Sequence, residues 1–107
     1  MAQERAAAET VGAEVEYRSR RSRAAAQALQ QQGFQVLGVG ATISVRAPAP
    51  LWTSVFGVHF EEVTATVAHG VTGSYLRPTT GGVTVPEDLS ELIADVLFAE
   101  PPEFFAN

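Results

Sequence analysis

Residues 81–98 of the chain read GGVTVPEDLSELIADVLF, and this stretch decides how the rest of the chain can pack. A glycine pair and a short β-type run lead to Pro86, and proline is favoured at the first position of a helix. Two acidic residues follow, where carboxylates interact favourably with the helix dipole. Beyond them, apolar residues recur at the spacing of one helix face. They are Leu89, Leu92, Ile93, Val96 and Leu97. We therefore predict a C-terminal helix from Pro86 to Phe98, which a proline pair keeps from continuing.

The first half of the chain shows a strand pattern, a helix pattern and a hairpin pattern. Residues 11–17 alternate between apolar and acidic or small side chains, which is typical of a half-buried strand. Residues 23–32 are rich in good helix formers, and Gly33 suits the position just past a helix end. Residues 34–39 and 42–47 are β-type runs on either side of a glycine-containing turn, so they predict a hairpin.

The middle of the chain predicts a short helix and a second pair of strands. Residues 51–56 place their apolar side chains on one helix face, and Gly57 follows them. Residues 58–69 predict a long strand whose alternation slips at Glu61-Glu62, where a β-bulge would return both apolar sets to the core. Residues 75–77 predict a short return strand.

The order of these elements is β-α-β-β-α-β, followed by a hairpin strand and a terminal helix. Two helices on one face of an antiparallel sheet make an α+β fold, and this order predicts a ferredoxin-like sandwich. We place a flexible segment at residues 1–10, a single domain at residues 11–98 and an extended tail at residues 99–107. A domain of this size buries roughly two-thirds of the surface that its unfolded chain exposes.

Charge is distributed unevenly along the chain. Residues 1–53 carry six Arg and four Glu, whereas residues 54–107 carry one Arg and eight acidic residues. An acidic half disfavours nucleic acid as a partner and favours a basic or polar protein surface. No apolar run approaches the roughly 20 residues of a membrane span, so we expect no membrane contact. The N-terminus lacks an apolar signal core, which makes the cytoplasm the default compartment and an extracellular location the expectation for a piece of an exported precursor.

The sequence contains no convincing catalytic or metal-binding pattern, and we expect neither an enzyme nor a cofactor. None of the six serines lies in a nucleophile elbow, and the chain has no cysteine. His59 and Glu61 would point to one side of a regular strand, so a metal pair competes there with two ordinary surface side chains. The carboxylate pairs Glu61-Glu62 and Glu87-Asp88 are interpreted as structural, because general acid–base chemistry needs a cleft and a shifted pKa.

Two segments suggest binding rather than catalysis. The only basic cluster is a solvated face, a dimer contact or a patch for a partner. It consists of Arg18, Arg20, Arg21 and Arg23. The second segment is the C-terminus, where Phe98, Phe104 and Phe105 flank a proline pair that keeps the chain extended. Either some of these rings fold back onto the core, or they present an extended aromatic peptide to the cleft of a partner.

Several short motifs, taken in order, resemble a known family. Residues 33–36 (GFQV), 42–45 (TISV) and 51–57 (LWTSVFG) resemble the pro-domains of sedolisin-type serine-carboxyl proteases such as kumamolisin. Val85-Pro86 and the apolar residues after it are similar to the proline-started last helix of those pro-domains. The resemblance covers about residues 22–98 and rests on the order and spacing of Gly, Pro and apolar residues. Subtilisin pro-domains are a looser match.

The resemblance implies a domain that assists the folding of a protease and inhibits it until removed. It implies that the last helix and the tail lie against the protease, with the tail crossing its cleft. The partner-binding residues that it implies are Glu87, Glu91, Phe98, Glu100, Pro101, Pro102, Glu103, Phe104 and Phe105. The catalytic Glu, Asp and Ser of the family have no counterpart in these residues. We therefore expect an inhibitor or folding chaperone of a cognate protease, and the alternative is a protein-interaction or self-assembly module that reuses the fold.

Overall fold

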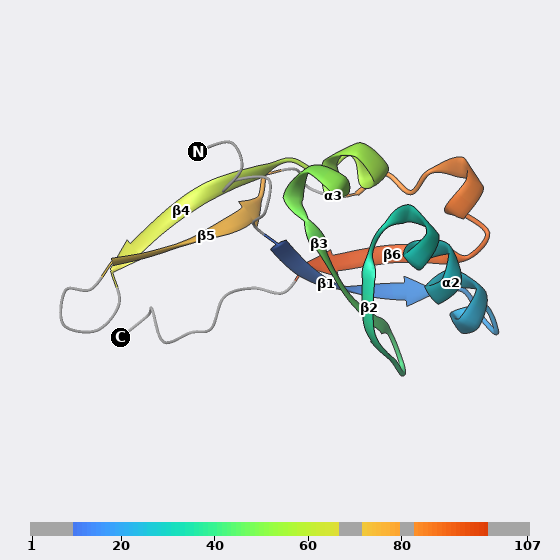
Figure 1. The fold of residues 1–107 in the computed structure, drawn as a ribbon. Helices are drawn as coiled ribbons and strands as arrows, with labels where there is room; N and C mark the ends of the chain where they lie inside the picture. The colour runs from blue at the N-terminus through green and yellow to red at the C-terminus, as the bar shows by residue number, and fades with distance from the viewer. Residues whose placement is uncertain (1–9, 67–71, 80–82, 99–107) are drawn as a thin grey trace.

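The computed structural model describes residues 10–66, 72–79 and 83–98, and it shows a mixed α+β fold (Figure 1). In chain order the elements are β1 (Thr10–Tyr17), α2 (Ser22–Gln32), β2 (Gln35–Val39), β3 (Ile43–Pro48), α3 (Ala49–Phe56), β4 (Phe60–Thr66), β5 (Thr72–Pro78), the 3-10 turn η2 (Glu87–Leu89) and β6 (Ile93–Phe98). The predicted tail at residues 99–107, and all but the last residue of the predicted N-terminal segment, lie outside the described residues.

Four strands form one antiparallel sheet in the order β2-β3-β1-β6. β1 is an inner strand, so Val15 stands opposite Ile43 of β3 on one side and Val96 of β6 on the other. β2 and β6 are the two edges of this sheet. The predictions for the first strand, the first helix, the hairpin and the second helix are confirmed, each to within two residues at its ends.

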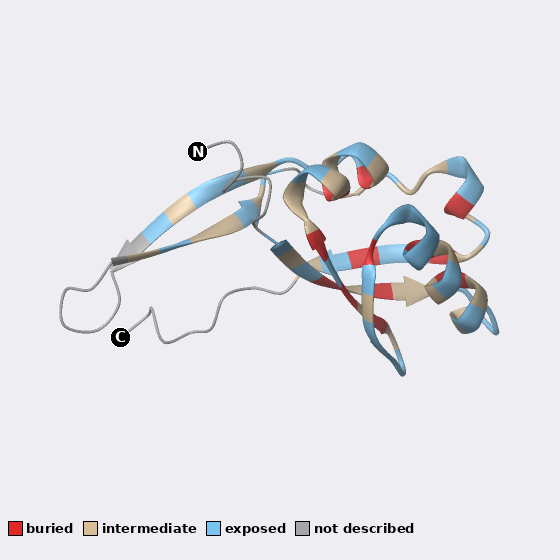
Figure 2. Cartoon of the chain, viewed as in Figure 1, coloured by how far each residue is buried: buried red, intermediate tan, exposed pale blue. Residues whose placement is uncertain are grey.

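Both helices lie on one face of the sheet, because buried residues alternate with more exposed ones along the strands and join the helices in a single core (Figure 2). Leu29 comes to this core from α2, and Trp52 and Phe56 come from α3. The Trp52 ring packs edge-to-face on Phe34 at a centroid distance of 4.7 Å. Its indole Nε1 donates a hydrogen bond of 3.0 Å to the carbonyl of Val11, which ties α3 to β1.

Glycines end both helices, as the sequence predicts. Gly33 follows α2 with a φ of 107°, and Gly57 follows α3 with a φ of 68°. Both angles lie in the left-handed region, which costs glycine far less than other residues. The amide of Gly57 donates to the carbonyl of Thr53, so the abrupt end of α3 leaves one fewer backbone acceptor without a donor.

The predicted C-terminal helix is wrong. Only Glu87–Leu89 forms a 3-10 turn, and Ile93–Phe98 is the strand β6. Ile93 and Val96 are three residues apart, yet both are buried on the same sheet face, because β6 holds one extra residue opposite Glu16 and Tyr17 of β1. In a regular strand, residues three apart point to opposite faces, but the extra residue of a β-bulge brings them to the same face. The apolar spacing of this segment is therefore helix-like, while in the fold the segment pairs with β1 as a strand.

The strand predicted at residues 58–69 is also placed differently. β4 pairs with β5 in a separate two-stranded sheet and does not join the larger one. The register between β4 and β5 is continuous through Glu61 and Glu62, so the bulge predicted there is wrong. The hairpin extends away from the larger sheet (Figure 1), and the longest dimension of the molecule is 47 Å. The hairpin thus precedes the last strand of the sheet instead of following it.

Candidate protein-binding surfaces

The structure separates the residues that the resemblance grouped as one binding surface. Glu87 and Glu91 are exposed in the turn before β6, whereas Phe98 lies at the far end of β6. A six-residue strand spans roughly 17 Å, so the two acidic residues lie at one end of β6 and Phe98 at the other. Residues 100–105, the rest of the predicted set, lie outside the described residues.

The Phe98 ring belongs to an aromatic cluster at the end of β6. Its centroid lies 4.9 Å from that of Trp52 and 5.6 Å from that of Phe60, both in edge-to-face geometry. These contacts join α3, β6 and the start of the β4–β5 hairpin. Of the two alternatives for the C-terminal rings, the structure shows the Phe98 ring folded back onto the core.

The face of the larger sheet that points away from the helices is half-exposed or exposed at every position, and no described element covers it. We call it the open face. Its residues are Thr10, Gly12, Glu14, Glu16, Gln35, Gly38, Ser44, Arg46, Pro48, Asp95 and Leu97, with Thr42 just before β3. The surface is predominantly polar, which suits a wet or charge-complementary protein contact better than a dry one.

Glu14 is the best-organised side chain on the open face. Its carboxylate accepts a hydrogen bond of 2.5 Å from Thr42 Oγ1 and bonds of 2.8 and 2.9 Å from Ser44 Oγ. The hydrogen bond from Thr42, followed by those from Ser44, lowers the pKa of Glu14, because both donors favour the ionised form. A fixed negative charge therefore stands on the inner strand β1 at the centre of the face.

Further negative charge lies between β1 and the edge strand β6. Glu16 is directly opposite Asp95, and Leu97 is opposite Glu14. Like charges directly opposite each other destabilise a strand pair. A basic group of a partner placed here would relieve that repulsion, so this side of the open face is suited to an Arg- or Lys-bearing protein surface. Arg46 on β3 is on the other side, where it donates a hydrogen bond to Thr10.

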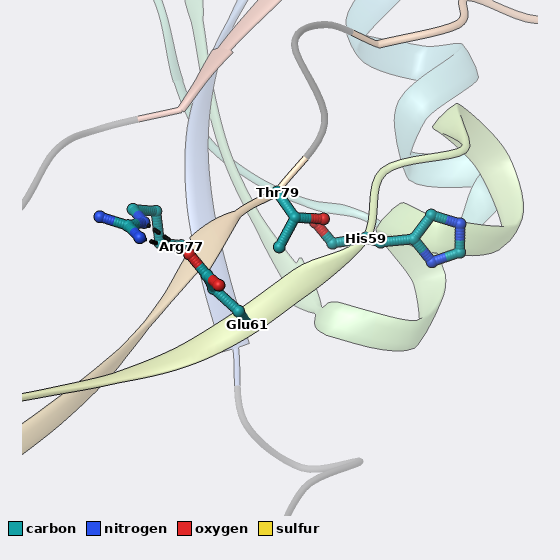
Figure 3. A network of polar contacts seen from close by, with 4 residues as sticks. All are labelled: His59, Glu61, Arg77 and Thr79. Atoms are coloured by element: carbon teal, nitrogen blue, oxygen red, sulfur yellow. Dashed lines mark hydrogen bonds and ion pairs between the residues drawn. The ribbon is translucent and has the colours of Figure 1, made fainter.

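His59 and Glu61, the residues considered for a metal pair, lie apart from each other on the β4 side of the hairpin, with Glu61 in an ion pair (Figure 3). The guanidinium of Arg77 donates to the carboxylate of Glu61 in an ion pair across the β4–β5 hairpin. Thr79 donates its amide and hydroxyl to the carbonyl of His59, at 2.8 and 3.2 Å. The His59 ring points away from Glu61 (Figure 3). Within the described ranges no group of three His, Cys, Asp or Glu side chains could hold a metal ion.

Sequence reasoning missed the open face as a candidate surface. The polar residues of β1 and β3 alternate with the apolar ones, so the sequence indicates a polar side for each strand. Which polar residues share one face of the sheet depends on the strand order, which the sequence does not give. Comparison of the chain with protein-family models, curated proteins and solved structures finds no match. Among the described helices, none has the length and apolar character needed to cross a bilayer.

Proposed function

We propose that this chain is a non-catalytic, pro-domain-like protein that docks on a cognate serine-type protease, covers its cleft and acts as an inhibitor or folding chaperone. The observation that supports the proposal best is the connectivity of the larger sheet. A ferredoxin-like sandwich has the order βαββαβ with its helices on one face. Here β1, α2, β2, β3, α3 and β6 follow in that order, with the β4–β5 hairpin inserted before the last strand.

The position of Phe98 supports a blocking role for the residues after it. Its ring contacts with Trp52 and Phe60 anchor the end of an edge strand. The sequence of residues 99–107 contains two prolines and two phenylalanines. Proline favours an extended conformation and lowers the entropy lost on binding, which suits a peptide laid along a cleft. In this proposal Glu100, Pro101, Pro102, Glu103, Phe104 and Phe105 are the residues that enter the cleft.

The open face supplies the docking surface in place of the helix that the sequence predicted. Glu14 is held rigidly by two hydroxyl donors, while Glu16 and Asp95, whose Oδ1 accepts a hydrogen bond from the Val96 amide, add negative charge nearby. Such charges steer association and fix the orientation of a partner more than they add affinity. The acidic open face would therefore fix the orientation of the domain on the protease, and the tail would block the active site.

The test compares the full chain with a version truncated after Phe98. Both are immobilised and used to capture proteins from an extract of the source organism, and captured fractions are assayed for peptide hydrolysis. We expect the full chain to capture a protease whose activity falls when the soluble full chain is added, and the truncated chain to inhibit it at least tenfold more weakly, or by about 1.4 kcal/mol. Captured fractions without protease activity, or activity that the full chain does not reduce, would contradict the proposal.

A second candidate function is self-assembly through the edge strand β2. Two large apolar side chains on this edge are exposed. Leu37 is 53% exposed and Val39 is 52% exposed. Strand edges without charge or proline can pair with a second copy. Sedimentation of the purified chain separates the two functions, because an inhibitor is expected to be monomeric alone. Leu37→Lys should abolish any dimer formed through β2, and Gln27→Lys at an exposed position of α2 serves as the matched charge control.

A further inference from the structure

The connection between β1 and α2, together with the first two residues of α2, has the sequence Arg18-Ser19-Arg20-Arg21-Ser22-Arg23. All four arginines are exposed. Arg18 is held, because its amide donates to the carbonyl of Leu92 and its Nε donates 2.7 Å to the carbonyl of Ser90. Across the described part of the chain, the side chains of the other three arginines form no hydrogen bond or ion pair. They are therefore free to enter the binding site of another protein.

Two backbone hydrogen bonds hold this turn, from the Arg21 amide to the Arg18 carbonyl and from the Ala25 amide to the Arg21 carbonyl, and other local features are unfavourable. Arg20 has a φ of 65°, which is unfavourable for a residue with a side chain. No side chain caps the start of α2, and its first turn contains no acidic residue. Three positive side chains instead stand at the positive end of the helix dipole. The first turn of α2 should therefore open locally at a small cost, which exposes an extended, arginine-rich segment.

Cutting this connection would remove the inner strand of the sheet. β1 pairs with β3 and β6 at once, and its Ala13 and Val15 are buried in the core. Trp52 also bonds to the carbonyl of Val11 on this strand. After a cut, β1 would be held only by non-covalent contacts, and its release would leave both β3 and β6 without a partner on that side. One cleavage would thus inactivate the domain.

We propose that Arg20–Arg23 is a processing site for an arginine-specific, trypsin-like endoprotease, and that this cut ends the function of the folded domain. Hydrolysis of the Arg21–Ser22 peptide bond consumes one water and leaves a carboxylate on Arg21 and an amine on Ser22. The equivalent bonds after Arg20 and Arg23 give the same result. The inference does not rest on the protease-inhibitor function, because any activity of the domain requires β1.

The other arginines of the described region provide internal controls. Arg46 lies on β3, which is paired on both sides, so a protease can reach it only after the sheet opens. Arg77 precedes Pro78, and trypsin-like proteases do not cleave an Arg-Pro bond. A cut at Arg5, outside the described residues, would leave β1 attached to the domain and is scored separately.

The test is limited digestion of the folded full chain with trypsin, with each product identified by mass spectrometry. We expect the first internal cut after Arg20, Arg21 or Arg23, at least about tenfold faster than after Arg46, because only local opening is needed. This rate should be insensitive to low urea, whereas the cut after Arg46 should follow global unfolding. A first cut after Arg46, or equal urea dependence at both places, would overturn the proposal.

Two further measurements complete the test. The triple variant Arg20→Gln, Arg21→Gln, Arg23→Gln, checked for folding by circular dichroism, should survive at least about tenfold longer, while Arg46→Gln should not. Survival equal to that of the parent chain would contradict the assigned site. The nicked chain should release the peptide that contains β1 and lose its sheet signal. A nicked chain that co-elutes with this peptide and melts at the parent temperature would refute the inactivation.

Discussion

Substitutions of Val96 and of Leu97 test whether residues 93–98 form the strand β6 or a helix. The sequence pattern places both residues on the apolar face of a helix, whereas the strand places them on opposite faces of the sheet. Val96 is 5% exposed and faces Val15 in the core, whereas Leu97 is 48% exposed on the open face. Val96→Ala removes two buried methyl groups at about 0.8 kcal/mol each, and the cavity adds to this, so we expect a loss of about 1.5–3 kcal/mol. Leu97→Ala should change stability by no more than about 0.5 kcal/mol.

The assay is urea unfolding followed by the fluorescence of Trp52, the only tryptophan, which is fully buried in the folded chain. Leu97→Thr is the matched control, because it keeps a good strand former at the exposed position. In a helix both residues would lie on the apolar stripe, and Val96→Ala would even improve helix propensity. Equal losses for the two alanine variants, or a neutral Val96→Ala, would therefore refute the assignment of β6.

Three other predictions follow from the described contacts. Phe56→Ala should cost about 3–5 kcal/mol in urea unfolding, because the ring is fully buried against Phe34 and Trp52; a loss under about 1 kcal/mol would contradict the packing of α3. Trp52→Phe leaves the carbonyl of Val11 without its donor and should cost about 1–3 kcal/mol, measured by circular dichroism. The folded pKa of Glu14 is lowered, so its contribution to stability is present above the pKa of an unfolded glutamate and disappears as pH falls through the folded value; Glu14→Gln should flatten that part of the stability profile, and an unchanged profile would contradict it.

Much of the fold was readable from local patterns. The strand at the N-terminus, both helices and the first hairpin were predicted because alternation, helix-forming residues and glycine stops all agreed in each segment. Gly33 and Gly57 marked helix ends through their freedom to take positive φ. The prediction failed at residues 92–97, because a short apolar run there is compatible with both the helical and the strand periodicity.

The candidate surfaces were less accessible to sequence reasoning. Phe98 was predicted as a partner-binding residue; its ring packs against Trp52 and Phe60, and the partner contact stays a prediction. Glu14 was recognised only as the polar phase of a strand, because its hydroxyl donors are Thr42, just before β3, and Ser44 on β3, about thirty residues away. The arginines at 18–23 were visible at once, but their importance depends on β1 being an inner strand, which the sequence does not state.

Local sequence patterns were sufficient wherever they agreed: they show which residues of β1 and β3 are apolar, where α2 and α3 end, and that the second half of the chain is acidic. The tertiary structure alone decided the partners of the strands. Without a neighbour on its second side, β1 would have no protein partner for its backbone donors and acceptors there, and a strand placed alongside supplies one. Ile93–Phe98 took that place through a bulge, which overrode its helical spacing, left β4 and β5 to pair with each other and created the open face.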